Sequence, residues 1–479
     1  MLATLVSRVG GAVILVVCLC ATACGSHTAT SRVQRAPSST LGDLQPPDVT
    51  ITHSAQKTSP GYVFVAEKKP KRPGGPMILD NKGRLVWYHQ LDPPLQATDF
   101  RVQSYQGKPV LTWWQGTIDT AGIGQGEDEI YDTSYRHIAT VDASPGLNAD
   151  LHEFQLTPRG TAFITAYNEL PADLSRVGGP KDGWLLDSVV EEIDVATGDV
   201  VFSWHSIAHV PLQDSREANA EPARDASQKR PLDYFHVNSV SDGPNNTILV
   251  SARNTSTIYD IARDGRIVWE LGGTHSDFRP PSAVKLNYQH DARLHGSLLT
   301  VFDNGAIPPV EKYTRPMEIR LDFRHKTARI VKTFLRPERL LSPFEGNLQL
   351  VPGGGAVVGW GGIPRVTEFD RSGKVVFELE LPYGDTYRGY RFRWSARPPG
   401  KPLIGVSGND VLASWNGATG IARWQVLGGT DEEHLSPVGR AAWNGLETRI
   451  AVGKLPKTIE VRALNAVGRV MGTSRPVTP

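Results

Sequence analysis

Three histidines in the sequence, His152, His236 and His290, each begin a segment of the same pattern. In each segment the histidine heads a short apolar run, a turn follows, and a second apolar run comes next. The spacings are 84 residues (236 − 152) and 54 residues (290 − 236). A single histidine in a strand is usually structural, but three at one repeat position are expected to face one another. Because imidazole serves as nucleophile, proton carrier or metal ligand, the three are candidates for catalysis or metal binding.

Two further side chains favour an anionic ligand over a metal. Asn238 lies two residues beyond His236, on the same strand face, and Arg253 ends the following strand, which returns it toward the histidines. Histidines alone suit zinc or copper, but a guanidinium disfavours a cation and forks onto sulfate or phosphate oxygens. The alternative for Arg253 is an ion pair with Asp233 or Glu153.

A fourth segment carries Glu345 where the others carry histidine, 55 residues (345 − 290) after His290. We expect its carboxylate to line the same channel, with Arg253 or a substrate proton as its partner. An earlier copy without histidine starts near Phe100. The charged run 205–230 precedes the His236 strand and is either a solvated loop or a cover over the channel.

The elements that position these residues repeat along the chain. An aspartate, a glycine and then a β-branched run ending in an aromatic recur, which predicts a hairpin turn followed by a strand. Interleaved with the histidine segments, this gives four strands per unit at a period of roughly 50 to 80 residues, which is typical of a β-propeller blade. A β-sandwich array or β-helix fits four strands per period less well. The sequence therefore predicts an all-β protein with a six-bladed propeller over residues 48–397. The four clearest turns begin at Asp80, Asp194, Asp264 and Asp370.

The two ends of the chain differ from the propeller. Short alternating strands that carry Trp415, Trp424 and Trp443 predict a small immunoglobulin- or fibronectin-like β-sandwich over residues 398–479. At the other end, an apolar run and small residues before Cys24 resemble a bacterial lipoprotein signal over residues 1–23. The alternative is an ordinary secretory signal. We expect Cys24 to be acylated, residues 24–47 to form a flexible tether, and the protein to be lipid-anchored on the extracytoplasmic face of the cell membrane.

Charge and cysteine content narrow the function further. The 51 basic and 50 acidic residues nearly balance, so the sequence offers no electrostatic basis for binding nucleic acid. All three cysteines precede residue 25, so the predicted mature chain has neither a disulfide nor a thiol nucleophile.

The motifs around these residues resemble the arylsulfotransferase family, and within it most closely the actinobacterial and fungal branch. The resemblance covers about residues 49–381 and rests on these segments: 61–64, 75–80, Asp233-Tyr234-Phe235-His236-Val237-Asn238-Ser239, Ser251-Ala252-Arg253-Asn254, Gln289-His290, Gly346-Asn347 and 358–361. Members of that family are six-bladed propellers that move a sulfuryl group from an aryl sulfate to a phenol, without a nucleotide sulfate donor. The resemblance implies that His290 becomes transiently sulfated, and it implies no cofactor.

By the same resemblance, His236, His152 and Arg253 hold the sulfuryl oxygens and handle the proton, with Asn238 in support. The chain departs from Gram-negative members, which carry a disulfide near the active site and place the extra sandwich before the propeller. Two alternatives stay open: a non-catalytic lipoprotein whose propeller binds a ligand or protein at the cell surface, and a metal-dependent hydrolase that uses the three histidines. A sulfotransferase is expected to have a dry mouth rimmed by aromatic residues.

Overall fold

The structure is a computed structural model that describes residues 34–54, 57–69, 73–279 and 284–479. Strands make up nearly all of its regular structure, and the described residues contain a single α-helix, α1 (Glu221–Arg224). Four 3₁₀ turns complete it: η1 (Ser175–Val177), η2 (Ser206–Ala208), η3 (Leu212–Asp214) and η4 (Pro244–Asn246). The predicted all-β class is confirmed.

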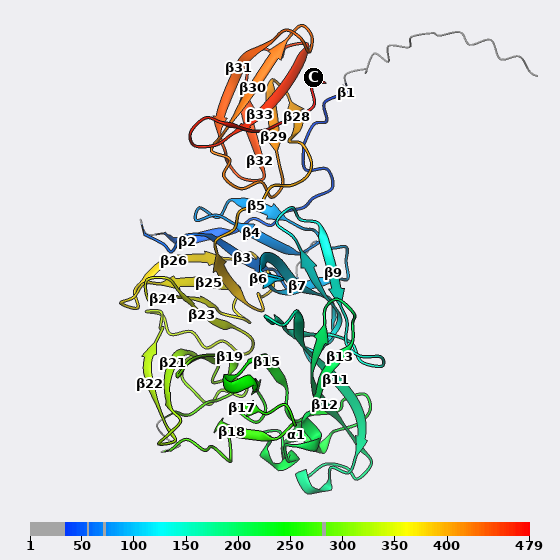
Figure 1. Cartoon of the computed structure of the whole chain (residues 1–479), viewed down its shortest axis with the longest axis vertical. Helices are drawn as coiled ribbons and strands as arrows, with labels where there is room; N and C mark the ends of the chain where they lie inside the picture. The colour runs from blue at the N-terminus through cyan, green and yellow to red at the C-terminus, as the bar shows by residue number, and fades with distance from the viewer. Residues whose placement is uncertain (1–33, 55–56, 70–72, 280–283) are drawn as a thin grey trace, which may run out of the picture.

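Six antiparallel sheets follow one another along the chain as the blades of a propeller (Figure 1). From the innermost strand outward they are β27 (Gly389–Phe392), β3 (Tyr62–Ala66), β4 (Pro76–Leu79), β5 (Leu85–Tyr88); β6 (Gln96–Tyr105), β7 (Lys108–Ile118), β8 (Gly124–Tyr131), β9 (His137–Val141); β10 (Asp150–Leu156), β11 (Thr161–Ala172), β12 (Gly183–Asp194), β13 (Val200–His205); β15 (Val237–Asp242), β16 (Ile248–Ala252), β17 (Thr257–Ile261), β18 (Ile267–Gly272); β19 (His290–His295), β20 (Leu298–Asp303), β21 (Arg315–Asp322), β22 (Thr327–Thr333); and β23 (Asn347–Val351), β24 (Gly355–Gly359), β25 (Arg365–Phe369), β26 (Val375–Glu380). A short strand, β14 (Leu232–Asp233), pairs in parallel with β12.

The turns read from the sequence lie before the outermost strands. Asp80 shows why the pattern works, because its Oδ1 accepts the backbone N–H groups of Lys82 at 2.8 Å and Arg84 at 2.9 Å. Gly83 has a φ of +74°, which glycine adopts at little cost. Asp194, Asp264 and Asp370 precede β13, β18 and β26 in the same way.

The propeller is closed by strands from the beginning and the end of its segment of the chain. β27, the last strand, pairs antiparallel with β3, so one sheet combines strands from both ends of the segment. β2 (Thr50–Ser54) adds to the outer edge of β26 in the preceding sheet. Closure of this kind joins the two ends of the propeller and leaves only short, protected sheet edges at its centre.

Charged side chains from the inner strands form a buried network beneath the histidine segments. Arg388 is 1 % exposed, and it donates to Asp99 Oδ1 at 2.9 Å and to both carboxylate oxygens of Glu153 at 3.3 Å. Glu153 also pairs with Arg101 and with Arg293, the latter at 2.6 Å. Burial raises the pKa of Glu153, but the three arginines outweigh burial and hold that pKa below its usual range. The network therefore ties the inner strands together with its charges paired.

Two further sheets form the C-terminal unit, drawn in orange and red in Figure 1 except for one blue strand from the start of the described chain. One contains β28 (Leu403–Ser407), β29 (Asp410–Ser414) and β32 (Glu447–Ala451); the other contains β1 (Gln34–Arg35), β35 (Val477–Thr478), β33 (Thr458–Leu464), β30 (Arg423–Gly429), β31 (Leu435–Ala442) and β34 (Val470–Thr473). Trp424, Val411 and Ile450 pack in one core between them. This unit contacts the propeller where Asn416 exchanges two hydrogen bonds with the Tyr88 backbone, at 3.0 and 2.9 Å.

The segment before the propeller differs from the flexible tether that the sequence predicts for residues 24–47. Its described part, from residue 34 on, runs along the C-terminal unit, as Figure 1 shows. The N–H of Thr40 donates to Glu447 Oε2 at 2.6 Å, and the N–H of Val406 donates to the Pro37 carbonyl at 2.7 Å. These bonds use the edges of distant strands, which a local reading of a Ser- and Pro-rich segment does not reveal. Cys24 and the signal segment 1–23 lie outside the described residues, and no described helix is long and apolar enough to span a bilayer.

Candidate active site

The three histidines come together at one end of the inner strands. The rings of His152 and His236 lie 4.8 Å apart, nearly perpendicular at 83°. His290 is 1 % exposed, and burial holds its pKa well below its usual range, with Arg253 acting in the same direction and His236 and His152 adding smaller effects. The structure therefore brings together the three histidines of the repeat and Arg253.

His152 and His236 are each backed by a carboxylate. The Nδ1 atom of His152 contacts Asp150 Oδ2, and the Nδ1 atom of His236 contacts Asp233 Oδ2. A carboxylate on Nδ1 fixes the ring and stabilises the imidazolium form, and it leaves Nε2 as the nitrogen available to a ligand. Burial nevertheless lowers the pKa of His152, because the effect of burial exceeds that of Asp150. Both histidines are thus arranged to give and take a proton at Nε2.

His290 has a neutral partner instead. Its Nδ1 lies 2.7 Å from Asn304 Oδ1 and 3.2 Å from the Tyr288 carbonyl, both of which only accept hydrogen bonds. Asn304 Nδ2 donates to the carbonyl oxygens of Glu345 at 2.9 Å and Ser342 at 3.3 Å, which fixes the amide with Oδ1 toward His290. Nδ1 of His290 therefore carries the proton, and Nε2 carries the lone pair.

Arg253 lies against neutral groups rather than in the ion pair considered from the sequence. Its guanidinium donates to Asn254 Oδ1 at 2.6 Å and to the Ile307 carbonyl at 3.2 Å, and it lies over the Tyr288 ring at 4.8 Å. Burial lowers the pKa of Arg253, with Asp233 acting in the opposite direction. An arginine with neutral contacts keeps its charge for an incoming anion.

Asn238 supports the site from below. It is fully buried, and its Nδ2 donates to the Gln289 carbonyl at 2.7 Å, immediately before His290. Tyr387 Oη donates to the backbone carbonyls of His152 at 3.0 Å and Asn238 at 3.3 Å. Asn238 thus holds the chain that carries His290.

Glu345 lies beside His290, but its partner differs from the expectation. Its carboxylate forms an ion pair with Lys68 rather than with Arg253. Its backbone N–H donates to His290 Nε2 at 3.2 Å. The sequence pattern placed Glu345 at the repeat position that the three histidines occupy. It could not show that Lys68, 277 residues away in the chain, contacts the Glu345 carboxylate.

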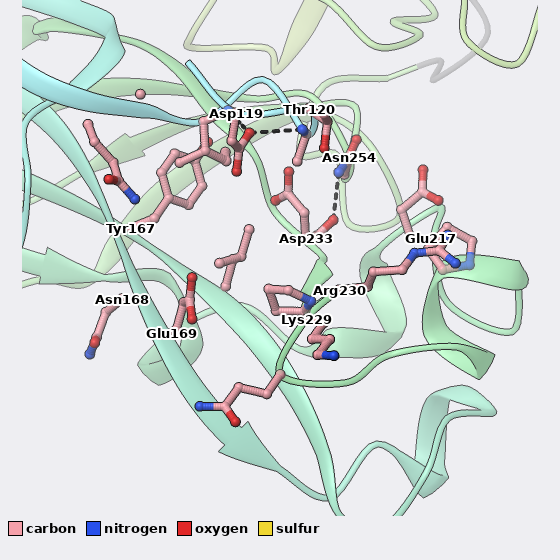
Figure 2. Close-up of a pocket in the computed structure, with 18 of the residues that line it drawn as sticks. Asp119, Thr120, Tyr167, Asn168, Glu169, Glu217, Lys229, Arg230, Asp233 and Asn254 are labelled. Atoms are coloured by element: carbon pink, nitrogen blue, oxygen red, sulfur yellow. Dashed lines mark hydrogen bonds between the residues drawn. The ribbon is translucent and has the colours of Figure 1, made fainter. Parts of the chain in front are cut away.

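A pocket of about 810 Å³ opens beside these residues. Figure 2 shows Asp233 between Tyr167 on one side and Glu217 on the other. Its described lining contains five acidic residues (Asp119, Glu169, Glu217, Asp225 and Asp233), three basic residues (Lys229, Arg230 and Arg253) and one aromatic residue, Tyr167. This pocket is therefore not rimmed by aromatic side chains as expected.

The charged run 205–230 forms part of this wall. Arg216 Nε donates to Ser256 Oγ at 2.6 Å, and its Nη2 donates to Asn287 Oδ1 at 3.0 Å. Ala223 of α1 is fully buried in the core shared by the third and fourth sheets. The segment is therefore anchored at a few buried positions, while most of its residues stay exposed.

Several site residues were missed in the sequence, and most share one position. Lys68 and Asn304 lie just after the second strands β3 and β20, as Arg253 lies after β16, whereas Tyr167 lies within β11. The argument that placed Arg253 at the site applies equally to these blades. Asp150 and Asp233 precede their histidines by two and three residues, a spacing that was a usable signal.

In the ranges that the structure describes, no group of three or more His, Cys, Asp or Glu side chains is arranged to hold a metal ion.

The chain has similarities to solved structures and to a sequence family. Among solved structures, the chain is similar to a Bacteroides caccae protein of unknown function (14 % identity, 69 % of this chain and 98 % of that chain, TM-score 0.43). It is also similar to virginiamycin B lyase from Staphylococcus aureus (12 %, 77 % and 95 %, 0.30) and to regucalcin, a calcium-binding protein from Agrobacterium tumefaciens (13 %, 72 % and 88 %, 0.30). No curated protein matches the sequence.

The family comparison is stronger. A model of the arylsulfotransferase (ASST) family matches residues 101–381, which is more than half of the chain and contains the three histidines, Arg253 and Glu345. The chain belongs to the arylsulfotransferase family.

Proposed function

We propose that the protein transfers a sulfuryl group from an aryl sulfate to a phenol through a sulfohistidine at His290, without a nucleotide sulfate donor. The observation that carries the proposal is the difference between the histidine partners. His290 is neutral with its lone pair on Nε2, whereas His152 and His236 have carboxylates on Nδ1. A nucleophile and proton carriers are thereby distinguished within one cluster.

In the first half-reaction, the Nε2 lone pair of His290 attacks sulfur, and the bond between sulfur and the aryl oxygen breaks. The leaving phenolate takes the electron pair and receives a proton from the imidazolium Nε2 of a neighbouring histidine. His236 suits this role better than His152, because its side chain is 12 % exposed against 4 % and its partner Asp233 lines the pocket.

In the second half-reaction, the acceptor phenol gives its proton to His236 and attacks sulfur. The bond between sulfur and nitrogen breaks, and the electron pair returns to His290 Nε2. Arg253 holds the sulfuryl oxygens in both halves, because a guanidinium offers paired donors to an oxyanion. Sulfuryl transfer, like phosphoryl transfer, depends mainly on positioning and charge stabilisation.

The same proposal places the enzyme outside the cytoplasm, anchored to the membrane through acylated Cys24. Small residues before Cys24 support this placement. Cys24→Ala is expected to move the protein from the membrane fraction to the soluble fraction and to abolish incorporation of labelled palmitate. A wild-type protein that takes up no label and is found in the soluble fraction would point to an ordinary secretory signal instead.

The experiment that tests the reaction measures phenol release from 4-nitrophenyl sulfate, with and without a phenol acceptor. Wild type and His290→Ala are compared, with His325→Ala as the control because that histidine is exposed at the β21–β22 turn. We expect release that rises with acceptor, disappears in His290→Ala and is unchanged in the control. A folded wild type that releases no phenol from several aryl donors would leave the pocket as the binding site of a non-catalytic propeller.

A further inference from the structure

Lys68, which follows β3, lies at the same end of the propeller as the histidines. It is 3 % exposed, and its ammonium pairs with the Glu345 carboxylate. A second carboxylate oxygen, Asp385 Oδ1, lies 3.7 Å from its Nζ. The charge of Lys68 also acts on His152, whose pKa it lowers. Lys68 is thus a buried cation in contact with the site, and the reaction described above gives it no role.

Glu345, the partner of Lys68, has an unusual backbone. Its φ is +62°, in the left-handed region that residues other than glycine rarely adopt. The neighbouring chain is packed tightly, since a Cβ at Gly361 would lie 2.6 Å from the Glu345 carbonyl carbon. A residue in this conformation persists only where its surroundings hold it.

Three contacts hold Glu345 in place around His290. Asn304 Nδ2 donates to its carbonyl at 2.9 Å, Lys68 pairs with its carboxylate, and its own N–H donates to His290 Nε2 at 3.2 Å. Asn304 contacts His290 Nδ1 at the same time. The left-handed turn therefore aims one peptide N–H at the nitrogen that is proposed to attack sulfur.

We propose that Lys68 is a positioning residue for His290. By pairing with the Glu345 carboxylate, Lys68 holds the Glu345 N–H against Nε2 of His290 and keeps that N–H within reach of the sulfuryl group. When Nε2 bonds to sulfur its lone pair is used, and the N–H moves to an adjacent sulfuryl oxygen. Donors fixed in advance at the place where an oxyanion forms stabilise it without reorganisation. This inference rests on the proposed sulfohistidine, but the contact itself exists without substrate.

Two readouts test the role. The first is the burst of 4-nitrophenol from 4-nitrophenyl sulfate, which reports the first half-reaction, together with the KM for the donor. The second is the nitrogen NMR signal of His290 Nε2 in protein with isotope-labelled histidine, identified by its loss in His290→Gln. The second readout needs no substrate, so it can fail or succeed independently of the sulfotransferase activity.

The variants are Lys68→Met, Lys68→Arg and the double change Lys68→Met with Glu345→Gln, with Lys108→Met as an exposed control. The double change matters because Lys68→Met alone buries an unpaired carboxylate and destabilises the fold. We expect the burst rate to fall about 10²-fold in Lys68→Met and in the double variant, as for a small misplacement of reacting groups. The Nε2 signal is expected to move in both, KM to change little, and Lys68→Arg to restore most of the rate.

An Nε2 signal that stays in place in the folded double variant would overturn the proposal, whatever happens to the rate. A moved signal with an unchanged burst rate would overturn it as well, because the contact would then have no effect on the attack.

Discussion

His290 Nδ1 lies 2.7 Å from the amide oxygen of Asn304, where the two neighbouring histidines each have a carboxylate. An amide oxygen accepts a hydrogen bond from the Nδ1–H group and orders the ring, but it adds no negative charge. That hydrogen bond raises the pKa of His290, and burial and the charge of Arg253 outweigh it and favour the neutral ring. A single choice of partner therefore separates the proposed nucleophile from the proposed proton carriers.

The variant Asn304→Asp tests, through the pH dependence of the phenol burst, whether the neutral partner of His290 sets its role as nucleophile. The new carboxylate favours protonated His290, so the pKa of His290 rises and the attacking form is lost at a higher pH. We expect the acid limb of the phenol burst to move toward neutral pH, with the rate recovering as pH is raised. An acid limb that stays in place would show that another group controls it. Asn304→Leu, which adds no charge, is expected to lower the rate without moving the limb.

Asp233→Asn tests the proton carrier. Without the carboxylate, His236 is a weaker proton reservoir, so the burst rate should fall by roughly 10²-fold for poor leaving groups. The loss should be smaller for 4-nitrophenyl sulfate than for phenyl sulfate, because nitrophenolate leaves without a proton more readily. Asp322→Asn is the matched control, since Asp322 and His325 have the same three-residue spacing on the exposed β21–β22 turn. Equal losses for both donors would remove His236 from proton transfer.

The pocket lining predicts the charge of the acceptor. Five acidic residues against three basic ones leave a net charge of −2 with His neutral (3 − 5), and Tyr167 is the one aromatic side chain among the described lining residues. A cationic phenol is therefore expected to have a higher kcat/KM than a neutral phenol of similar size, and an anionic one a lower value. Tyramine, 4-ethylphenol and 4-hydroxyphenylpropionate form a suitable series. The preference should shrink in Glu169→Gln with Glu217→Gln and at high salt, and a reversed order would show that Arg253 and Arg230 dominate.

The sequence predicted the residues that recur at repeat positions, and it missed the contacts between segments that are far apart in the chain. His152, His236 and His290 were found because each holds one position in a repeat, and the four Asp–Gly turns were found because local chemistry encodes them. Lys68 and Glu345 lie 277 residues apart, and nothing local links them until β27 closes onto β3. Asn304 was within reach, because the argument used for Arg253 applies to the next blade.

Two other outcomes have the same physical cause. Residues 24–47 were predicted to be a tether and the run 205–230 either a solvated loop or a cover, because both segments are polar and lack periodicity. In the structure, their backbone and charged groups find partners on strands far away in the chain, such as Glu447 for Thr40 and Ser256 for Arg216. Polar segments without a pattern are thus the places where sequence alone underestimates order.

Activity is expected to fall as pH rises through about 8, on account of Lys68. Burial lowers the pKa of Lys68 to about 8, with Asp385 and Asp150 acting in the opposite direction and Lys69 adding to the effect of burial. Above that pH the amine becomes neutral, and the Glu345 carboxylate loses its partner. The basic limb of the burst should therefore disappear in the double variant Lys68→Met with Glu345→Gln, leaving a low and flat alkaline profile. A basic limb that persists there would belong to another group.

Arg388 makes the propeller sensitive to the loss of a single buried charge. It is 1 % exposed and bonds to Asp99 and Glu153, and Glu153 also pairs with Arg101 and Arg293. Removing one partner from a buried ion network costs about 3–5 kcal/mol, because the remaining charge is left uncompensated in the interior. We expect Arg388→Met to lower the free energy of unfolding by about that amount in urea, measured by tryptophan fluorescence. Arg449→Met, which breaks the exposed pair with Asp410, should cost about 1 kcal/mol or less. Equal losses in the two variants would mean that the central network is dispensable, and that apolar packing between the blades carries the stability.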